Sequence, residues 1–232
     1  MRGLTVIHQP DFLPYLGFFH RLIKAKTFVV LDNVQFVRGT KEAWHYRDKI
    51  KTLQGEQWIN VGIKKCALGT LINQVELQES DEWRVRMKNL IIQNYSKASY
   101  FKEIMPHMEE IIFHPSKLMW DFNWHSIQKL MSMFEIENEI LWASQLDVRG
   151  KSNELVVNIL KAIGATSYLS GVGAKAYYEP EPFLKNGIDV VWQDFKHPNY
   201  DQLHGEFIPY LTSMDLFFNC GLKESQKVLR CL

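Results

Sequence analysis

Two short apolar runs near the start of the chain, one helix-length apart, constrain the fold most strongly. Residues 4–7 (LTVI) and 28–31 (FVVL) each consist of apolar or β-branched residues throughout, which is typical of strands buried on both faces. Between them, residues 15–24 (YLGFFHRLIK) repeat apolar side chains three and four positions apart, as an amphipathic helix does. The pattern predicts a right-handed strand–helix–strand unit of a parallel sheet.

A second set of elements follows in the last third of the chain. Residues 152–165 (SNELVVNILKAIGA) predict a helix that ends at Gly164. Residues 167–171 and 187–195 predict two further strands. Together with the N-terminal unit they predict an α/β fold with a Rossmann-like, mostly parallel sheet. Because 46% of the 232 residues are hydrophobic, the chain has enough apolar surface for one large domain.

The segment between these two sets has a different character. Residues 44–65 contain two strand-like pieces around a Gln54-Gly55 turn, so we expect residues 44–80 to form a hairpin insertion over the sheet. Residues 81–147 are predicted to form a helical subdomain. It contains one or two helices over 81–114, capped at Ser99 and kinked or broken at Pro106, and another over 117–134. A final helix with Gly221 near its end completes a single domain over residues 1–232.

Charge, cysteine content and the length of apolar runs argue against several classes of protein. The formal net charge of +1 gives no general attraction to nucleic acid. The chain has three widely spaced cysteines, an odd number that fits reduced thiols better than a disulfide framework or a zinc motif. No stretch approaches the roughly 18 apolar residues of a membrane span, and the N-terminus does not resemble a secretory signal. We therefore expect a cytoplasmic protein that has no membrane partner and binds no metal.

Polar residues follow three of the predicted strands, at the sheet edge where open parallel sheets bind ligands. They are His8, Gln9 and Asp11, with Tyr15 at the start of the helix; Asp32 and Gln35; and Ser170 and Gly171. If the predicted topology holds, the three groups meet at one edge. Each also has a purely structural interpretation, because a single histidine is often a hydrogen-bonded core residue and Asp, Asn and Gly are common turn residues.

Two further segments combine polar and aromatic residues. In residues 44–51 (WHYRDKIK), strand alternation places Arg47, Lys49 and Lys51 on one face, where they could hold phosphates. Trp44 or Tyr46 could then stack on a base or a sugar ring. A solvated strand face explains the same pattern. Residues 192–202 (WQDFKHPNYDQ) follow a predicted strand and suggest a loop that reads sugar hydroxyls, or a hydrogen-bonded loop that braces the fold. The candidate binding residues of this loop are Gln193, His197, Tyr200 and Gln202.

Several blocks of the sequence, in order along nearly the whole chain, resemble the WbqC-like family of bacterial proteins. They are IHQPDFLPYLGFFHRL, FVVLDNVQF, WHYRDKIKT, TSYLSGVGAKAYYE, VVWQDFKHPNYDQ and FIPYLTSMDLFFNCG. Such proteins occur in gene clusters for O-antigen, a part of lipopolysaccharide, and for other surface polysaccharides. One departure is Gly62, which stands where family members tend to have proline.

The resemblance implies a transferase that moves an acyl or aminoacyl group, such as glycyl, onto a nucleotide-linked amino sugar. On that hypothesis His8 is the base that deprotonates the attacking amine, and Asp11 or Asp32 orients it. Arg47 and Lys49 would hold the diphosphate. No cofactor is implied beyond an activated acyl donor, for which an aminoacyl-tRNA and a carrier protein are the alternatives.

Two other functions fit parts of the sequence. The absence of a hydrolase elbow, a Walker loop or a zinc helix favours a non-catalytic protein that binds a nucleotide sugar or assembles a pathway. The strand–helix–strand start is also similar to nucleotidyltransferase domains. Their His-x-Gly-His motif is lacking here, since Phe18 follows Gly17, and this makes nucleotidyl transfer the weakest of the three hypotheses.

Overall fold

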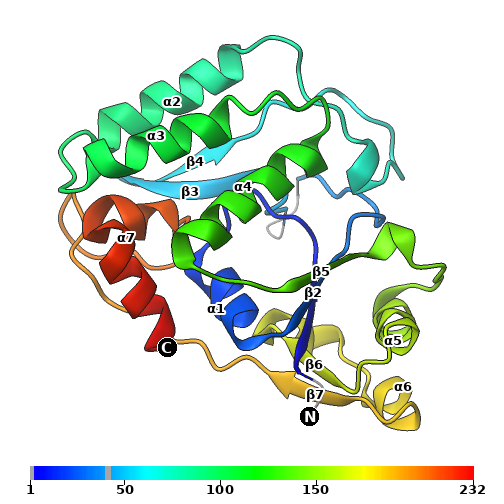
Figure 1. The fold of residues 1–232 in the computed structure, drawn as a ribbon. Coiled ribbons are helices and arrows are strands. Elements are labelled where there is room, and N and C mark those ends of the chain that lie inside the picture. The colour runs from blue at the N-terminus through cyan, green and yellow to red at the C-terminus, as the bar shows by residue number, and fades with distance from the viewer. Residues whose placement is uncertain (1–2, 40–42) are drawn as a thin grey trace.

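The fold is built on one parallel sheet, seen in a computed structural model that describes residues 3–39 and 43–232. The sheet order is β5-β2-β1-β6-β7, and every neighbouring pair is parallel (Figure 1). The predicted α/β fold with a Rossmann-like sheet is therefore confirmed. The strands are β1 (Thr5–His8), β2 (Thr27–Val30), β5 (Glu139–Trp142), β6 (Ser167–Ser170) and β7 (Asp189–Trp192).

Side chains that alternate along the strands cover both faces of the sheet. Val6 and Phe28 point to one face and pack with α1, α4 and α7, whereas Ile7 and Val29 point to the other and pack with α5 and α6 (Figure 1). The helices are α1 (Leu16–Lys24), α2 (Glu82–Tyr95), α3 (Phe101–Ile112), α4 (Met119–Phe134), α5 (Ser152–Ala162), α6 (Pro180–Lys185) and α7 (Met214–Arg230).

The strand order identifies where a ligand should bind. From β1 the chain moves outward to β2 and β5, and then returns to the other side of β1 to add β6 and β7. The direction of winding therefore reverses between β1 and β6, and helices leave these two strands on opposite faces. Open α/β sheets bind ligands in the crevice outside the carboxyl ends of the strands at such a switch point.

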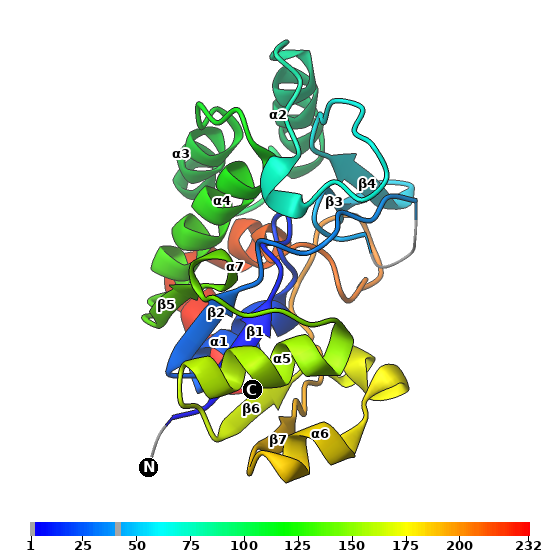
Figure 2. The same cartoon turned by 90° about the vertical axis from the view of Figure 1, so that its right-hand side faces the viewer.

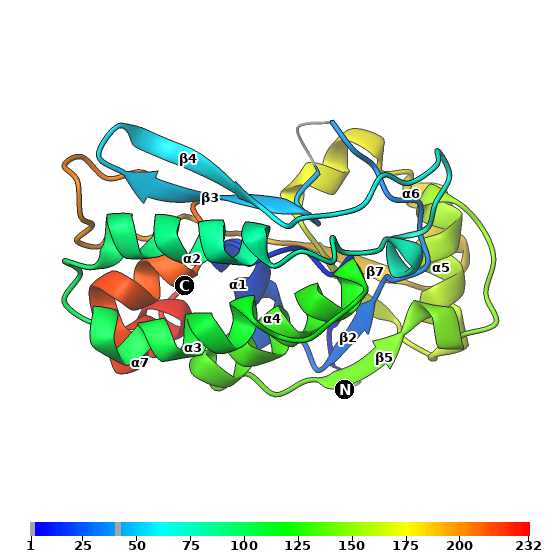
Figure 3. The same ribbon diagram turned by 90° about the horizontal axis from the view of Figure 1, so that it is seen from above.

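The predicted hairpin is also present. Strand β3 (Arg47–Thr52) pairs antiparallel with β4 (Gly55–Asn60), and α2 and α3 run side by side next to it (Figure 3). Just beyond β4, a Cβ at Gly62 would lie 2.4 Å from the ring of Trp83 in α2. Only a residue without a side chain fits this approach, so the packing of Trp83 requires glycine at position 62.

The sequence patterns did not predict one strand of the sheet. Of the one or two helices predicted over 81–114 the structure has two, α2 and α3, and α4 follows them, but the region 81–147 also contains the edge strand β5. Distant groups hold this short strand in place. The Asn138 side chain donates to the carbonyls of Leu22 and Ala25, and the Thr27 hydroxyl donates to Glu139. Because the two partners of each of these hydrogen bonds lie more than 100 residues apart in the sequence, no local sequence pattern predicts the strand.

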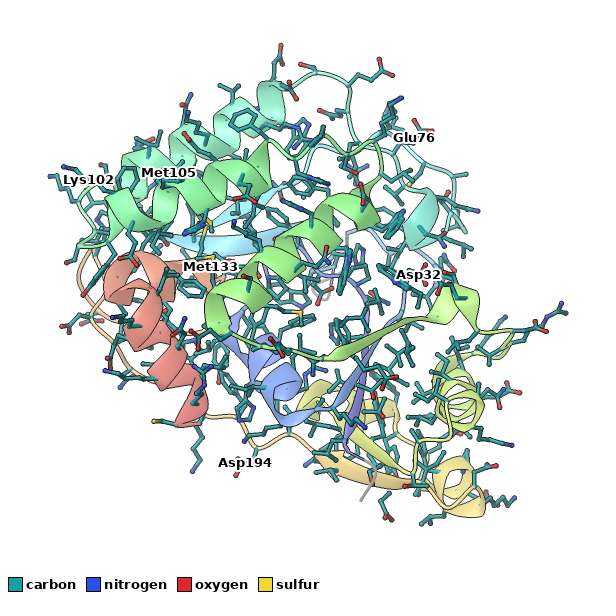
Figure 4. All side chains as sticks on the ribbon, in the orientation of Figure 1. Asp32, Glu76, Lys102, Met105, Met133 and Asp194 are labelled. Carbon is teal, nitrogen blue, oxygen red and sulfur yellow. The ribbon has the colours of Figure 1, made fainter. Side chains whose placement is uncertain are left out.

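Helix α3 differs from its prediction as well. Pro106 lies inside the helix, yet α3 continues from Phe101 to Ile112 without a break, and its N-cap is Tyr100 rather than Ser99. Proline removes the hydrogen bond that residue 106 would donate to the Lys102 carbonyl. Lys102 is exposed at the edge of the molecule, so water can satisfy that carbonyl (Figure 4).

Glycine 221 lies in the middle of α7 rather than near its end. Its backbone is non-helical there (φ 74°, ψ 175°), and it divides α7 at a kink. An added Cβ would lie 2.5 Å from the ring of Tyr100. The kink thus lets the second half of α7 turn past the start of α3.

We expect Gly221→Ala to lower the free energy of unfolding by about 1–3 kcal/mol from backbone strain alone, because this φ/ψ region is essentially restricted to glycine. The clash with Tyr100 adds to that cost. Urea denaturation measures the change. Gly187→Ala is the control, since residue 187 also has positive φ (64°) but no atom within 4 Å of its added Cβ. Equal losses in both variants would contradict the steric part of this account.

No helix in the described part of the chain is both long and apolar enough to cross a membrane. The three cysteines are free thiols.

Candidate functional site

A pocket of about 730 Å³ opens at the switch point of the sheet. It lies beyond the carboxyl ends of β1 and β6 and is bordered by the first residues of α5, which crosses one face of the sheet (Figure 2). Its volume is in the range of small-molecule and cofactor sites. Eight of the residues predicted from sequence line it: His8, Gln9, Asp11, Tyr15, Trp44, Ser170, Gly171 and Gln193.

The loop after β1 is held rigidly against the rest of the fold. The buried amide of Asn123 in α4 donates to the carbonyls of Pro10 (2.7 Å) and His45 (2.6 Å). The Phe12 backbone N–H donates to the Trp44 carbonyl. These bonds fix the loop to α4 and to the segment before the hairpin, so the side chains of the loop are presented to the pocket on a firm support.

His8 lies at the end of β1 with its side chain 30% exposed. Its Nδ1 is 2.9 Å from the Gln9 carbonyl oxygen, and a carbonyl can only accept. Nδ1 therefore carries the proton, and Nε2 keeps its lone pair. Burial, and then the nearby positive charge of Arg21, lower the pKa of His8 to about 3, so the imidazole is neutral at physiological pH.

Two carboxyl groups share the pocket with His8. Asp11 Oδ2 lies 3.5 Å from His8 Nδ1, and burial raises the pKa of Asp11 to about 7. Asp48 accepts a hydrogen bond from the Lys49 backbone N–H, and burial raises the pKa of Asp48 well above its usual range. Burial thus favours the neutral form of Asp48, and Asp11 is close to its midpoint at pH 7.

Tyr15 folds back over the first turn of α1. A Cβ at Gly17 would lie 2.3 Å from the Tyr15 ring, so glycine is needed for this packing. The ring also meets Phe195 and Tyr210 from the segment after β7. Burial raises the pKa of the Tyr15 hydroxyl, so Tyr15 lines the pocket as a neutral side chain.

Gln193 follows β7 and ties that strand to α1. Its Nε2 donates to the Gly17 carbonyl (2.8 Å) and lies 3.0 Å from His20 Nδ1. A Cβ on Gly171 would lie 3.9 Å from its Oε1, which places the amide oxygen next to the end of β6. Gln193 thus positions two strand ends relative to one helix at the pocket edge.

Arg21 is a pocket residue that the sequence patterns did not identify. It belongs to α1, is buried, and lines the pocket with its side chain. The available signal was weak but present. Arg21 falls among Phe18, Phe19 and Leu22 on a helix whose buried side is otherwise mostly apolar, a place where a surface arginine is not expected.

Asp32 does not orient His8. It is buried at the end of β2, where its Oδ1 accepts a hydrogen bond from the Ser144 backbone N–H (2.9 Å), next to the turn that follows β5 (Figure 4). Asp11 is the carboxyl group beside His8. Gln35, predicted with Asp32, is exposed and forms a bridge to Leu71 outside the pocket lining.

The basic residues of the hairpin also lie outside the pocket lining. The Arg47 guanidinium stacks on the Trp58 ring at 4.3 Å, and the Lys49 Nζ lies 2.6 Å from Glu56. Both side chains therefore meet Trp58 on one face of the hairpin, as the alternation predicts, and Lys49 also approaches the same ring. Whether they bind a phosphate stays a prediction.

The polar loop after β7 serves mainly to brace the fold. Tyr200 and Gln202 both donate to Asp215, which is completely buried in α7 and also accepts from Tyr95 in α2. His197 Nδ1 donates to the Pro198 carbonyl. These three residues of the loop do not line the pocket, whereas Gln193 does.

Within residues 3–39 and 43–232, no group of three or more His, Cys, Asp or Glu side chains is arranged to hold a metal ion.

Comparison with known proteins agrees with the resemblance in the sequence. The chain is 27% identical over 234 residues to an uncharacterized protein of Mycobacterium tuberculosis (strain ATCC 25618 / H37Rv), an alignment that covers 100% of this chain and 99% of that protein. No solved structure gives a significant match, so the likeness to nucleotidyltransferase domains stays a prediction. The model of the WbqC-like protein family matches residues 9–227, and the chain belongs to that family.

Proposed function

We propose that the protein transfers an acyl or aminoacyl group to the amine of a nucleotide-linked amino sugar, in the synthesis of O-antigen or another bacterial surface polysaccharide. The observation that carries the proposal is a neutral His8 whose Nε2 lone pair is free in a pocket at the switch point of the sheet. Family membership supports the pathway. A reaction on a nucleotide-linked substrate is consistent with a cytoplasmic location.

The chemistry requires one proton to move while one bond forms and another breaks. The nitrogen of the sugar amine attacks the carbonyl carbon of the acyl donor, and the new C–N bond replaces the C–O or C–S bond to the leaving group. His8 Nε2 takes the proton from the nitrogen and returns it to the leaving oxygen or sulfur. Asp11, close to Nδ1, stabilises the imidazolium that exists between these two transfers.

Ligand binding would make His8 a better base. A pKa of about 3 keeps the imidazole neutral but leaves it weakly basic, and the charge of Arg21 is the second cause of that low pKa. An anion bound beside Arg21 would offset its charge and raise the pKa of His8 toward its ordinary value. The base would then gain strength only when a charged substrate fills the pocket.

The direct test incubates the purified protein with a panel of nucleotide-linked amino sugars and three donors: aminoacyl-tRNA, an acyl thioester of a carrier protein, and an acyl-adenylate. We expect a nucleotide sugar to gain the mass of the acyl group with one of the donors, detected by mass spectrometry. The matched control is the corresponding nucleotide sugar with a hydroxyl in place of the amine. Acylation of both sugars would contradict attack by the amine.

The alternative function is capture of a nucleotide sugar without catalysis. The low basicity of His8 in the empty pocket favours it. Calorimetric titration with the same sugars separates the two functions, because tight binding with no product for any donor would overturn the transferase proposal and support a binding or assembly protein.

A further inference from the structure

The most unusual group in the pocket is a buried positive charge without a negative partner. Arg21 is only 6% exposed, and its Nε is buried without a hydrogen-bond partner. No carboxylate among the described residues lies within 4.0 Å of its guanidinium, which lies 5.8 Å from the centre of the Phe18 ring. Its charge acts on Asp11 only at longer range, where it partly offsets the rise in the Asp11 pKa that burial causes. Because an uncompensated buried charge destabilises a fold, a group outside the chain is expected to pair with it.

The surroundings of Arg21 leave its guanidinium open to the pocket. A Cβ on Gly171 would lie 3.6 Å from Arg21 Nη1, in ordinary contact distance. Any longer side chain at position 171 would therefore contact the guanidinium. Because residue 171 is glycine, no side chain follows the end of β6 at this point, and a ligand in the pocket can approach Arg21.

The N-terminal end of α5 opens on the same pocket. Ser152 and Asn153 line it, and no side chain caps this end of the 11-residue helix. Within the described parts of the chain, the backbone N–H groups of Ser152, Asn153 and Glu154 have no acceptor. Free N–H groups and the positive end of the helix dipole favour an anion at this position.

We infer that Arg21 and the N-terminal end of α5 form the subsite for a phosphate group of the ligand. A phosphate or diphosphate has more oxygen atoms to offer to the guanidinium fork and to the helix N–H groups of this pocket, whereas the fork alone occupies both oxygens of a carboxylate. Only the identification of the ligand as a nucleotide-linked sugar rests on the proposed function. The subsite itself requires no transfer reaction.

The remaining charges of the pocket agree with an anionic ligand. Burial raises the pKa of Asp48 well above its usual range and that of Asp11 to about 7, and His8 is neutral. Below pH 7, where Asp11 is mostly protonated, the pocket therefore carries the charge of Arg21 with little to oppose it.

The test titrates inorganic pyrophosphate into the whole protein by calorimetry at constant ionic strength, and acetate in a parallel arm. We expect pyrophosphate to bind to the wild type and Arg21→Met to weaken this binding by about 30-fold or more, as loss of charge-assisted hydrogen bonds does. Arg86→Met is the control, because it removes the same charge from an exposed site on α2 outside the pocket.

Thermal unfolding without ligand separates binding from a structural role. A buried charge that serves only the ligand costs stability when the pocket is empty, so Arg21→Met should melt at the same or a higher temperature than the wild type. A lower melting temperature, or failure to fold, would overturn the inference, as would equal pyrophosphate affinity in wild type and variant. Binding of acetate as tight as that of pyrophosphate would overturn the phosphate assignment and identify a carboxylate subsite instead. None of these measurements needs an acyl donor, so failure of the subsite and failure of the transferase proposal are distinguishable.

Discussion

The His8→Gln variant is expected to lose about 10²–10⁴-fold in turnover number, the usual contribution of a positioned general base. Glutamine keeps a polar side chain of similar reach but cannot take up a proton. Because His8 is part-exposed and makes its one hydrogen bond to the neighbouring Gln9 carbonyl, the melting temperature should change little. Steady-state kinetics of acyl transfer and thermal unfolding of the same preparation measure the two effects.

The controls for this prediction use Asp11 and Asp32, the two carboxyl groups that follow the first two strands of the sheet. Asp11→Asn should lower turnover, because Asp11 lies 3.5 Å from His8 Nδ1, whereas Asp32→Asn should affect mainly stability, since Asp32 binds the Ser144 backbone. A parallel loss of turnover and melting temperature in His8→Gln would mean that His8 is a structural residue.

The pH dependence provides an independent check on the same pair. The value of kcat/KM reports groups that titrate in the free enzyme. The pKa of Asp11 is raised to about 7 and that of His8 is lowered to about 3. Asp11 must lose its proton to stabilise the imidazolium, so kcat/KM should rise as the pH increases through about 7. The Asp11→Asn variant should have no such rise, and a rise that persists in it would assign the titration to another group.

The Asp215→Ala variant is expected to lose about 3–5 kcal/mol of unfolding free energy. Asp215 is completely buried and accepts hydrogen bonds from Tyr95 (2.7 Å), Tyr200 (2.9 Å) and Gln202 (2.8 Å). Its removal takes the acceptor from the buried Tyr95 hydroxyl and from the half-buried Tyr200 hydroxyl, at about 1–3 kcal/mol each before the structure relaxes. The Gln202 amide keeps the Ile208 carbonyl as an acceptor. A domain is stable by only about 5–15 kcal/mol, so the loss is a large fraction of the total.

Equilibrium unfolding in urea measures this loss, with Asp201→Ala as the control. Asp201 lies between Tyr200 and Gln202 in the loop after β7 but is exposed, so its replacement should change stability by less than about 0.5 kcal/mol. Tyr200→Phe removes the hydroxyl that donates to Asp215, and it leaves the residues that line the pocket unchanged. It should lower stability without weakening ligand binding, and weaker binding would restore the predicted role of Tyr200 in reading the substrate.

Sequence patterns predicted best those strands and helices whose apolar residues lie close together along the chain, in a run or at helical spacing. LTVI, FVVL and SYLSG became β1, β2 and β6, and the helix between the first two became α1. The strand β5 was missed because Asn138 and Thr27 fix it through contacts with distant parts of the chain.

The candidate site divides in the same way. The rule that ligands bind beyond the carboxyl ends of parallel strands located His8, Asp11 and Gly171 without knowledge of the tertiary structure, because only the order of elements was needed. The rule also suggested Asp32, which faces Ser144 instead. Which strand end borders the pocket depends on the position of the switch point, and that depends on where the later strands join the sheet.

By itself, the sequence determined that the chain folds around a parallel sheet, belongs to the WbqC-like family and gathers polar residues after its first and fourth sheet strands. These properties follow from local periodicity and from residues that are adjacent along the chain. Only the tertiary structure decided that Arg21 is buried with its Nε lacking a hydrogen-bond acceptor, and that Tyr200 and Gln202 donate hydrogen bonds to Asp215. The physical reason is that a polar side chain acquires its role from its partners in space. The Gly171 end of β6 meets Arg21, and α7 meets the loop after β7, only when the chain has folded.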